Sequence, residues 1–143
     1  QIARSAKRLK VEDGLELVPA VPRDALAALV AQAPFCVAPL RRDLRNDVQG
    51  CNPIKLYEYM AAGRAVLATD LRCVREIVTH DETGWLVRPN PKALAEGLLR
   101  LAGDPALRER LGEAARRTIE EGGTWAHRRA ELVEAYEALL ARA

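Results

Sequence analysis

The sequence is poor in residues on which several classes of protein depend. Its 143 residues include only three cysteines, Cys36, Cys51 and Cys73, an odd number without the close paired spacing of metal or redox motifs. This pattern argues against a disulfide framework, so we expect free thiols in a reducing compartment. Cys51 borders the polar segment described below, where we expect it to pack as a small hydrophobic side chain.

Long apolar stretches and an excess of one charge are also absent. No run of residues is long enough to cross a membrane, and no signal peptide is visible. The 22 Lys and Arg residues and 20 Asp and Glu residues give a net charge of +2, which is too balanced to indicate nucleic acid as a partner. We expect a cytoplasmic protein, with peripheral membrane attachment as the alternative for a longer form of it.

Aromatic residues make up only 4% of the chain, whereas hydrophobic residues make up 49%. A core is therefore expected, built mainly from Leu, Val, Ala and Ile. The length suits one domain, which we place at residues 1–143. Basic and acidic residues lie beside one another in the predicted helices, which is typical of a solvated surface.

One polar segment carries signals for both ends of a short helix. Asn52 is predicted to be the N-cap, Pro53 suits the first helical position, and Gly63 can adopt the left-handed conformation that ends a helix. Apolar runs at residues 35–39 and 65–69 predict strands on either side. Strand, helix and strand in this order form a βαβ unit, so the two strands are predicted to be parallel neighbours.

The start of this helix is a candidate anion site, because its free N–H groups lie just beyond the carboxyl end of a strand. Lys55 follows in the first turn and Glu58 one turn later. Lys55 suits a phosphate and Glu58 suits a pair of ribose hydroxyls, the order expected for a nucleotide lying along the helix. The alternative is an ordinary surface ion pair between Lys55 and Glu58, worth at most ~0.5 kcal/mol.

The rest of the chain extends the α/β pattern. A basic helix is predicted at residues 2–10, a strand at 15–19 and a helix at 22–32. A short helix is predicted within residues 71–78 and another strand at 84–87. About four short strands alternating with helices predict an open parallel sheet with flanking helices, which is a Rossmann-like α/β fold.

Three helices are predicted to close the chain, and each begins with a capping residue. Asn90 and Asp104 are each followed by proline, and Thr124 caps the last helix. Each helix also has an apolar face typical of core packing. The three faces consist of Leu94, Leu98 and Leu101; of Leu107, Leu111, Ala115 and Ile119; and of Trp125, Leu132, Tyr136 and Leu139 or Leu140.

The loop at residues 41–50 leads from a predicted strand end to the helix at Asn52. Because it joins the strand end to the helix start, this loop lies where a diphosphate would bind. It contains the polar residues Arg41, Arg42, Arg45 and Asn46. A solvated surface loop is the alternative, since loops collect both charge and function.

Four segments together resemble one known family. Residues 53–70, 81–87, 90–94 and 104–112, in this order, are similar to the retaining "group 1" glycosyltransferases with the GT-B fold. The similarity covers nearly the whole chain. It is closest to the subgroup that has proline, an aliphatic residue, lysine, leucine, an aromatic residue and glutamate at the start of the donor-site helix.

The resemblance implies that two domains bind different substrates. In the family the N-terminal domain binds the acceptor and the C-terminal domain binds the sugar nucleotide. We expect this chain to be most of a C-terminal domain, without its first strand and helix and the diphosphate contacts they supply. Residues 124–143 are then the helix that crosses back to the N-terminal domain. Trp125 and Tyr136 are expected to form a solvent-facing patch or to be covered by self-association.

The resemblance also implies roles for individual residues. Glu58 matches the glutamate that holds the nucleotide ribose. Asn52, Lys55 and the backbone of Pro53, Ile54, Lys55 and Leu56 match the stretch that meets the diphosphate and sugar. The wider family has a second glutamate eight positions before the first, where this chain has Gly50. The resemblance therefore assigns no catalytic residue.

The resulting hypothesis is the donor-binding domain of a retaining glycosyltransferase that uses a UDP- or GDP-sugar. The expected partners are this donor and the acceptor-binding domain, with self-association through the last helix. No metal and no further cofactor are expected, and the chain alone should be inactive. A sugar-nucleotide epimerase and a non-catalytic α/β interaction module are the alternatives. A receiver domain is a weaker third, since Asp70 ends a strand without an acidic cluster.

Overall fold

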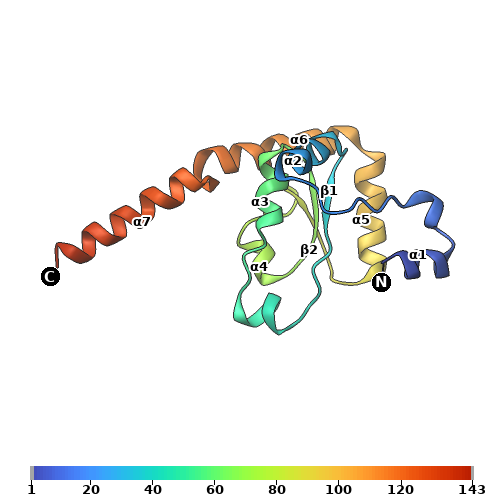
Figure 1. The fold of residues 1–143 in the computed structure, drawn as a ribbon, viewed down its shortest axis with the longest axis horizontal. Coiled ribbons are helices and arrows are strands. Elements are labelled where there is room, and N and C mark those ends of the chain that lie inside the picture. Colours follow the sequence, from blue (N-terminus) through green and yellow to red (C-terminus); the bar gives the residue numbers. More distant parts are fainter. Residues whose placement is uncertain (1, 143) are drawn as a thin grey trace.

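Three short parallel strands form the centre of the structure, a computed structural model that describes residues 2–142. Helices lie on both faces of this sheet (Figure 1). In chain order the elements are α1 (Ile2–Leu9), η1 (Glu12–Gly14), α2 (Arg23–Gln32), β1 (Cys36–Ala38), η2 (Arg45–Gln49), α3 (Ile54–Ala61), β2 (Val66–Thr69), α4 (Arg72–Arg75), β3 (Trp85–Val87), α5 (Pro91–Gly103), α6 (Pro105–Thr118), η3 (Ile119–Gly123) and α7 (Trp125–Leu140).

The strand order is β1-β2-β3, with β2 in the middle. Cys36 pairs with Val66, and Leu67 pairs with Trp85, both in parallel register. Helix α3 connects β1 to β2, so the predicted βαβ unit is confirmed. All three strands end at one edge of the sheet, and the loop that contains η2 extends from this edge (Figure 1).

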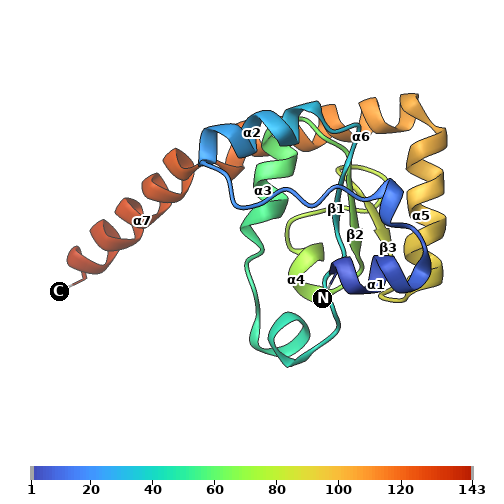
Figure 2. The ribbon, with the colours of Figure 1, turned by 45° about the vertical axis from the view of Figure 1, so that its right-hand side comes forward.

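The side chains of β2 alternate between the two faces of the sheet, as the period of a strand requires. Val66 and Ala68 pack with Leu56 and Met60 of α3, and α4 covers the same face. Figure 2 shows the sheet between α3 and α4 on one side and α5 on the other. The Rossmann-like α/β fold with flanking helices, which the sequence predicts, is therefore confirmed.

The opposite face of β2 carries Leu67, which packs against the closing helices. Leu101 of α5 and Leu107 and Leu111 of α6 belong to the same buried cluster. Leu101 and Leu111 are fully buried. The predicted apolar faces of these two helices are therefore core faces, although Leu98 stays partly exposed.

The caps of the three closing helices lie where the sequence places them. The Asn90 side chain accepts from the Ala93 N–H at 2.9 Å, and the Asp104 side chain accepts from the Leu107 N–H at 3.0 Å. Thr124 accepts from the backbone N–H of His127 at 3.3 Å, and the His127 Nδ1 accepts from the Thr124 N–H at 3.4 Å. Each cap satisfies an N–H group that the helix itself cannot.

The strand predicted at residues 15–19 is wrong. This segment is not part of the sheet, which has three strands rather than about four. Leu15, Leu17 and Val18 are exposed, Leu17 by 53% of its surface. A strand needs a neighbour for its backbone groups, and among residues 2–142 no strand lies beside this segment.

Helix α7 stands away from the rest of the molecule (Figures 1 and 2). None of its described residues is buried. Trp125 is 79% exposed and Tyr136 is 61% exposed, so the predicted solvent-facing apolar patch is confirmed. The prediction that the apolar face of this helix packs in the core is wrong, because the helix extends away from the sheet. Within residues 2–142, no helix is both long enough and apolar enough to cross a membrane.

All three cysteines are free thiols, as predicted, but they differ in exposure. Cys36 and Cys73 are buried, and Cys51 is partly exposed. Burial raises the pKa of Cys36 to about 11, against a smaller lowering by Arg64, and burial is also the main cause that raises the pKa of Cys73. Because the thiolate is the reactive form, both buried thiols should be inert.

We expect one rapidly reacting thiol when the native chain is treated with a disulfide reagent at pH 8. Denaturant should release all three, because unfolding removes the burial that protects Cys36 and Cys73. Absorbance of the released thiol counts the reacted groups. A Cys51→Ser variant serves as the control and should show no rapid reaction. Equal rates for all three native thiols would contradict the packing of Cys36 and Cys73.

Candidate functional site

The start of α3 differs by one residue from the sequence prediction. The helix begins at Ile54, and Pro53, with φ −76° and ψ 90°, is the residue before it. Its extended ψ keeps Pro53 out of the helix, while its carbonyl accepts the Leu56 N–H at 2.9 Å. Among the described residues 2–142 no side chain caps this helix and Pro53 holds the N-cap position, so the prediction that Asn52 is the N-cap is wrong. The first N–H groups of α3 therefore lack a side-chain acceptor.

The other end of α3 matches the prediction. Gly63 has φ +66°, the left-handed conformation that a glycine adopts without strain. The Gly63 N–H donates to the Met60 carbonyl at 2.9 Å, and the Arg64 N–H donates to the Tyr59 carbonyl at 3.1 Å. These bonds close the helix and direct the chain into β2. The position of α3 beside the sheet is thus set at both of its ends.

Glu58 lies on the side of α3 that faces away from the sheet. Its side chain is exposed, and among the ion pairs of residues 2–142 none joins it to Lys55. With a rise of ~1.5 Å per residue, Glu58 lies ~6 Å along the axis from Ile54. The carboxylate is therefore free to accept hydrogen bonds from a ligand that starts at the first turn of α3.

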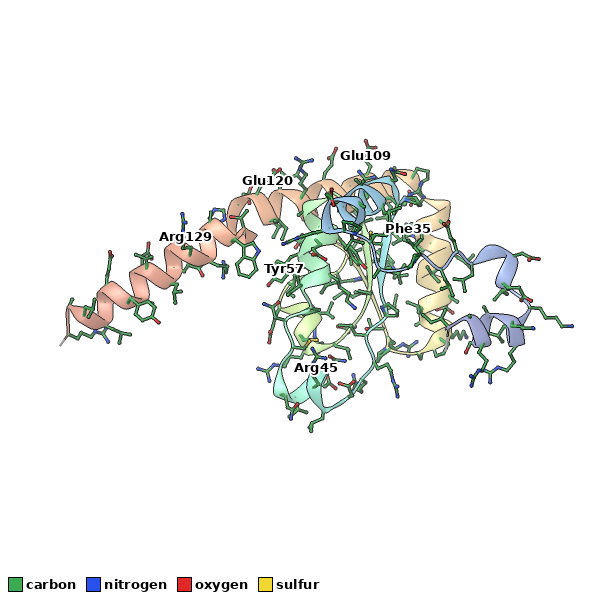
Figure 3. The ribbon with its side chains drawn as sticks, in the orientation of Figure 1. Phe35, Arg45, Tyr57, Glu109, Glu120 and Arg129 are labelled. Atoms are coloured by element: carbon green, nitrogen blue, oxygen red, sulfur yellow. The ribbon has the colours of Figure 1, made fainter. Side chains whose placement is uncertain are left out.

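An open groove of about 330 Å³ runs along α3 beside Glu58. Its volume is in the range of pockets that hold small ligands. Figure 3 shows Tyr57 on the flank of α3 that faces the start of α7. The groove is lined by Arg23 of α2; by Asn52, Ile54, Tyr57, Glu58 and Ala61 at or before α3; by Ile119 and Gly123 of η3; and by Thr124, Trp125 and Arg128 at α7.

The predicted site residues fall into two groups in this geometry. Asn52, Ile54 and Glu58 line the groove. Lys55 is exposed but lies outside it, and the side chains of Pro53 and Leu56 are buried, so these two can reach a ligand only through their backbone. The groove thus brings Asn52 and Glu58 together, whereas Lys55, which the sequence analysis assigns to the same nucleotide, does not line it.

Two arginines that line the groove could not be predicted from a sequence motif. Arg23 is the first residue of α2, and Arg128 lies in the first turn of α7, so neither belongs to the segment around Glu58. Arg128 donates to the Gly122 carbonyl at 2.7 Å and pairs with Glu131 at 2.8 Å, whereas Arg23 has no ion pair within the described chain. Only the packing of α2, α3 and α7 brings them near Glu58.

The loop at residues 41–50 is partly ordered by its own polar contacts. The buried Asn46 donates from its side chain to the Arg41 carbonyl at 2.8 Å, and its N–H donates to Asp43 at 2.9 Å. Arg42 pairs with Asp47 at 3.5 Å. Arg45 lies in the loop below the carboxyl ends of the strands (Figure 3). Asn46 and Arg42 therefore hold the loop together.

Acidic residues do not gather at the end of β2. Asp70 pairs with Arg75 at 3.5 Å, and within residues 2–142 no group of three or more His, Cys, Asp or Glu side chains is placed to hold a metal ion. This arrangement does not favour a receiver domain, which needs an acidic cluster there. The polar groups suited to a ligand are instead those along α3.

The arrangement along α3 offers two kinds of contact. Free N–H groups and a positive helix dipole at Ile54 favour an anion. The Glu58 carboxylate has two acceptor oxygens for a pair of hydroxyls. Tyr57 and Trp125 add apolar surface on which a flat ring can lie. A molecule with an anionic group, a diol and a planar base fits this sequence of contacts.

Comparison with known proteins identifies a family that matches most of the chain. The family described as "Glycosyl transferases group 1" matches residues 1–118. A phosphatidyl-myo-inositol mannosyltransferase of Mycobacterium tuberculosis is 37% identical over an alignment of 92 residues that covers 59% of this chain and 23% of that protein. The chain thus spans about a quarter of the length of this relative.

Two solved structures have the same fold. The sucrose-phosphate synthase of Thermosynechococcus elongatus superimposes with a TM-score of 0.87 at 25% identity, over 99% of this chain and 34% of that one. The C-terminal domain of a glycosyl transferase group 1 family protein from Francisella tularensis gives a TM-score of 0.71 at 20% identity, over 87% of this chain and 61% of that one. The likeness to the first of these covers the described helices and strands from α1 to α7.

Proposed function

Because the chain belongs to the group 1 family of glycosyl transferases, we propose that it is the donor-nucleotide-binding domain of a retaining glycosyltransferase. The enzyme would move a sugar from a UDP- or GDP-sugar to an acceptor. The observation that carries this proposal is the exposed Glu58 carboxylate one turn beyond the start of α3, a carboxylate that has no ion pair within residues 2–142.

In this proposal the donor lies along α3. The diphosphate meets the N–H groups of Ile54 and Lys55, where the helix dipole favours negative charge. The ribose lies beside the second turn, where both of its hydroxyls can donate to Glu58. Lys55 sits outside the groove but on the adjacent flank of the same turn, so its ammonium group can reach a phosphate oxygen at the helix start.

Gly50 bears on the chemistry of the donor sugar. It has φ +83°, a backbone conformation that side chains with a Cβ rarely adopt. A glutamate at this position would be strained, so the loop is shaped for glycine rather than for a carboxylate above the sugar. We therefore assign no catalytic residue, and transfer would depend on stabilising the charge that develops on the leaving diphosphate.

The acceptor side of the enzyme belongs, in this proposal, to a separate N-terminal domain. The chain covers 34% of the sucrose-phosphate synthase structure and 23% of the mannosyltransferase relative, which leaves room for such a domain in the whole enzyme. Residues 1–143 would then be the sugar-nucleotide half of a GT-B enzyme. No metal or further cofactor is required, because the helix start and the nearby basic groups can neutralise a diphosphate.

Glu58→Gln is expected to weaken the binding of UDP and GDP about tenfold, because a charged hydrogen bond contributes roughly 1.5–3 kcal/mol. The substitution keeps the size of the side chain, removes its charge and replaces one acceptor oxygen by a donor amide group. Titration by calorimetry, or by NMR if binding is weak, measures the change. Glu113→Gln on the exposed face of α6 is the matched control and should bind as the parent does.

Equal nucleotide affinity in the parent and in Glu58→Gln would contradict the ribose clamp. No binding of either nucleotide by the parent at millimolar concentration would contradict the site as a whole, and would favour a non-catalytic interaction module. A loss of affinity in Glu113→Gln of the same size would show a general charge effect rather than a contact.

A further inference from the structure

A second groove lies on the other side of Glu58, between α2 and the end of α3. Its volume is about 390 Å³, and Figures 1 and 2 both show α2 beside that end of α3. We name it the α2 groove. Apart from Arg23 and Glu58, every residue that lines it is an alanine, a leucine or a valine. Its walls therefore suit a flat, largely apolar ring, whose side-chain polar contacts can come only from these two charged residues.

The α2 groove and the groove along α3 meet at three residues. Arg23, Glu58 and Ala61 line both of them, whereas Asn52 and Ile54 line only the groove along α3. With a rise of ~1.5 Å per residue, Ala61 lies ~4.5 Å beyond Glu58 along the axis of α3. The junction is therefore on the far side of Glu58 from the helix start. A nucleotide whose phosphates lie at Ile54 and whose ribose lies at Glu58 brings its base to this junction.

The side chain available to the base at the junction is a pure donor. Arg23 is exposed at the first position of α2, and it makes no ion pair within residues 2–142 although Glu58 lines the same two grooves. A guanidinium group has five N–H donors and no acceptor. Among residues 2–142, Glu58 is the one carboxylate that lines either groove, and the ribose hydroxyls occupy it.

Given the donor position proposed above, on which this assignment rests, we propose that Arg23 selects the base of the nucleotide. Its guanidinium donates to a carbonyl oxygen, so the site accepts uracil or guanine and rejects cytosine and adenine. Uracil O4 and guanine O6 are acceptors, whereas cytosine and adenine carry an amino group, which is a donor, at the corresponding ring position. An amino group facing the guanidinium would leave the donors of both groups without an acceptor.

The other role open to Arg23 is neutralisation of the diphosphate. The position of Arg23 argues against it, because the α2 groove reaches Ala61 and Ala62 but not the helix start at Ile54. The two roles also differ in what they predict. An arginine at the diphosphate would strengthen the binding of every nucleoside diphosphate by the same factor, whereas an arginine at the base edge changes the ratio of their affinities.

Calorimetric titration of the full chain with UDP and CDP measures that ratio. The two ligands share the diphosphate, the ribose and the size of the ring. We expect the parent to bind UDP about 10-fold more tightly than CDP, and GDP more tightly than ADP. Arg23→Met keeps the long apolar stem and removes the guanidinium, so the ratio should fall close to one. Arg117→Met, on the exposed face of α6 and outside both grooves, is the matched control and should keep the ratio of the parent.

A reversed charge at the same position gives the sharper test. Arg23→Glu should invert the preference, because a carboxylate accepts from the amino group of cytosine. The added negative charge weakens both nucleotides, so the result is read as the ratio of their affinities. Since Arg23 is exposed and an acidic side chain is favourable in the first turn of a helix, this variant should have the circular dichroism of the parent.

Three results would overturn the role of Arg23. They are equal affinities of the parent for UDP and CDP, a ratio that Arg23→Met leaves unchanged, and a loss in Arg23→Met that is the same for both nucleotides, which would place the guanidinium at the diphosphate. Equal affinities in a parent whose binding depends on Glu58 would overturn this role alone. Absence of binding by any nucleotide would overturn the donor site itself and the role of Arg23 with it.

Discussion

Gly112→Ala is expected to destabilise the fold by about 2–3 kcal/mol, although alanine is the better helix former. Gly112 lies on α6 where this helix crosses the end of α3. An added Cβ would collide with the carbonyl oxygen of Gly63 and would lie 3.0 Å from its carbonyl carbon and 3.3 Å from the Ala65 nitrogen. These are backbone atoms, so no rotamer change can relieve the contact.

The turn at Gly63 has little freedom to move away from α6. Gly63 holds φ +66°, and its own N–H and that of Arg64 close α3. Three residues later the chain enters β2, whose residues Val66 and Leu67 are fully buried between the two layers of helices. A shift at Gly63 would therefore move a central strand. Because domains of this size have only ~5–15 kcal/mol of stability, the expected loss is a large share of it.

Thermal unfolding followed by circular dichroism measures the effect. A loss of about 3 kcal/mol should lower the Tm by roughly 10 °C. Gly103→Ala is the matched control, since Gly103 is the last residue of α5 and an added Cβ there meets nothing within 4 Å. This control should be neutral or slightly stabilising. Equal Tm values for Gly112→Ala and the parent would show that α6 does not press on the Gly63 turn.

These two glycines show what a sequence can and cannot predict. The role of Gly63 as the end of a helix can be predicted from the local sequence, because Gly63 follows a predicted helix and precedes a predicted strand. The need for glycine at 112 depends on where α6 crosses α3, and the two meet only after folding. The caps at Asn90, Asp104 and Thr124 are likewise local, since each side chain bonds a backbone group three residues later.

The errors of the sequence reading have physical causes of the same kind. Leu15 and Leu17 have the composition of a strand, but a strand is defined by its neighbour, which no local pattern contains. Asn52 and Pro53 read as a cap and a first helical residue, yet Pro53 keeps an extended ψ of 90° and the helix starts one residue later. The residue preferences thus predicted the helix correctly but not the residue at which it begins.

Part of the candidate site could likewise be predicted from the sequence, and part could not. Glu58 was predicted because its type and its spacing from the helix start suit a ribose, and the structure leaves its side chain exposed. Arg23 and Arg128 were not predicted, since they come from α2 and α7 and meet Glu58 only across the groove. The sequence spacing of residues 23, 58 and 128 does not predict that they line the same groove. The groove forms only when the helices pack, whereas Glu58 can be identified from the local sequence motif.

The second large effect concerns catalysis by the chain alone. Under the proposed function, we expect no sugar transfer from a UDP- or GDP-sugar by the purified 143-residue chain. Transfer requires donor and acceptor to be held together in reacting geometry, and this positioning can supply ~7–11 kcal/mol of the barrier. The proposal places the acceptor side in a separate domain, so a chain that binds only the donor lacks that contribution.

Product analysis by mass spectrometry, with simple saccharides as acceptors, makes the measurement. Nucleotide binding is titrated on the same sample, so that absence of product is read on a chain whose site is intact. Addition of the acceptor-binding domain should give transfer, and Glu58→Gln should then lower it because the ribose hydroxyls lose a charged acceptor. Transfer by the chain alone would overturn the division into halves. Release of an epimerised nucleotide sugar would instead identify an epimerase, for which the same groove would hold the whole substrate.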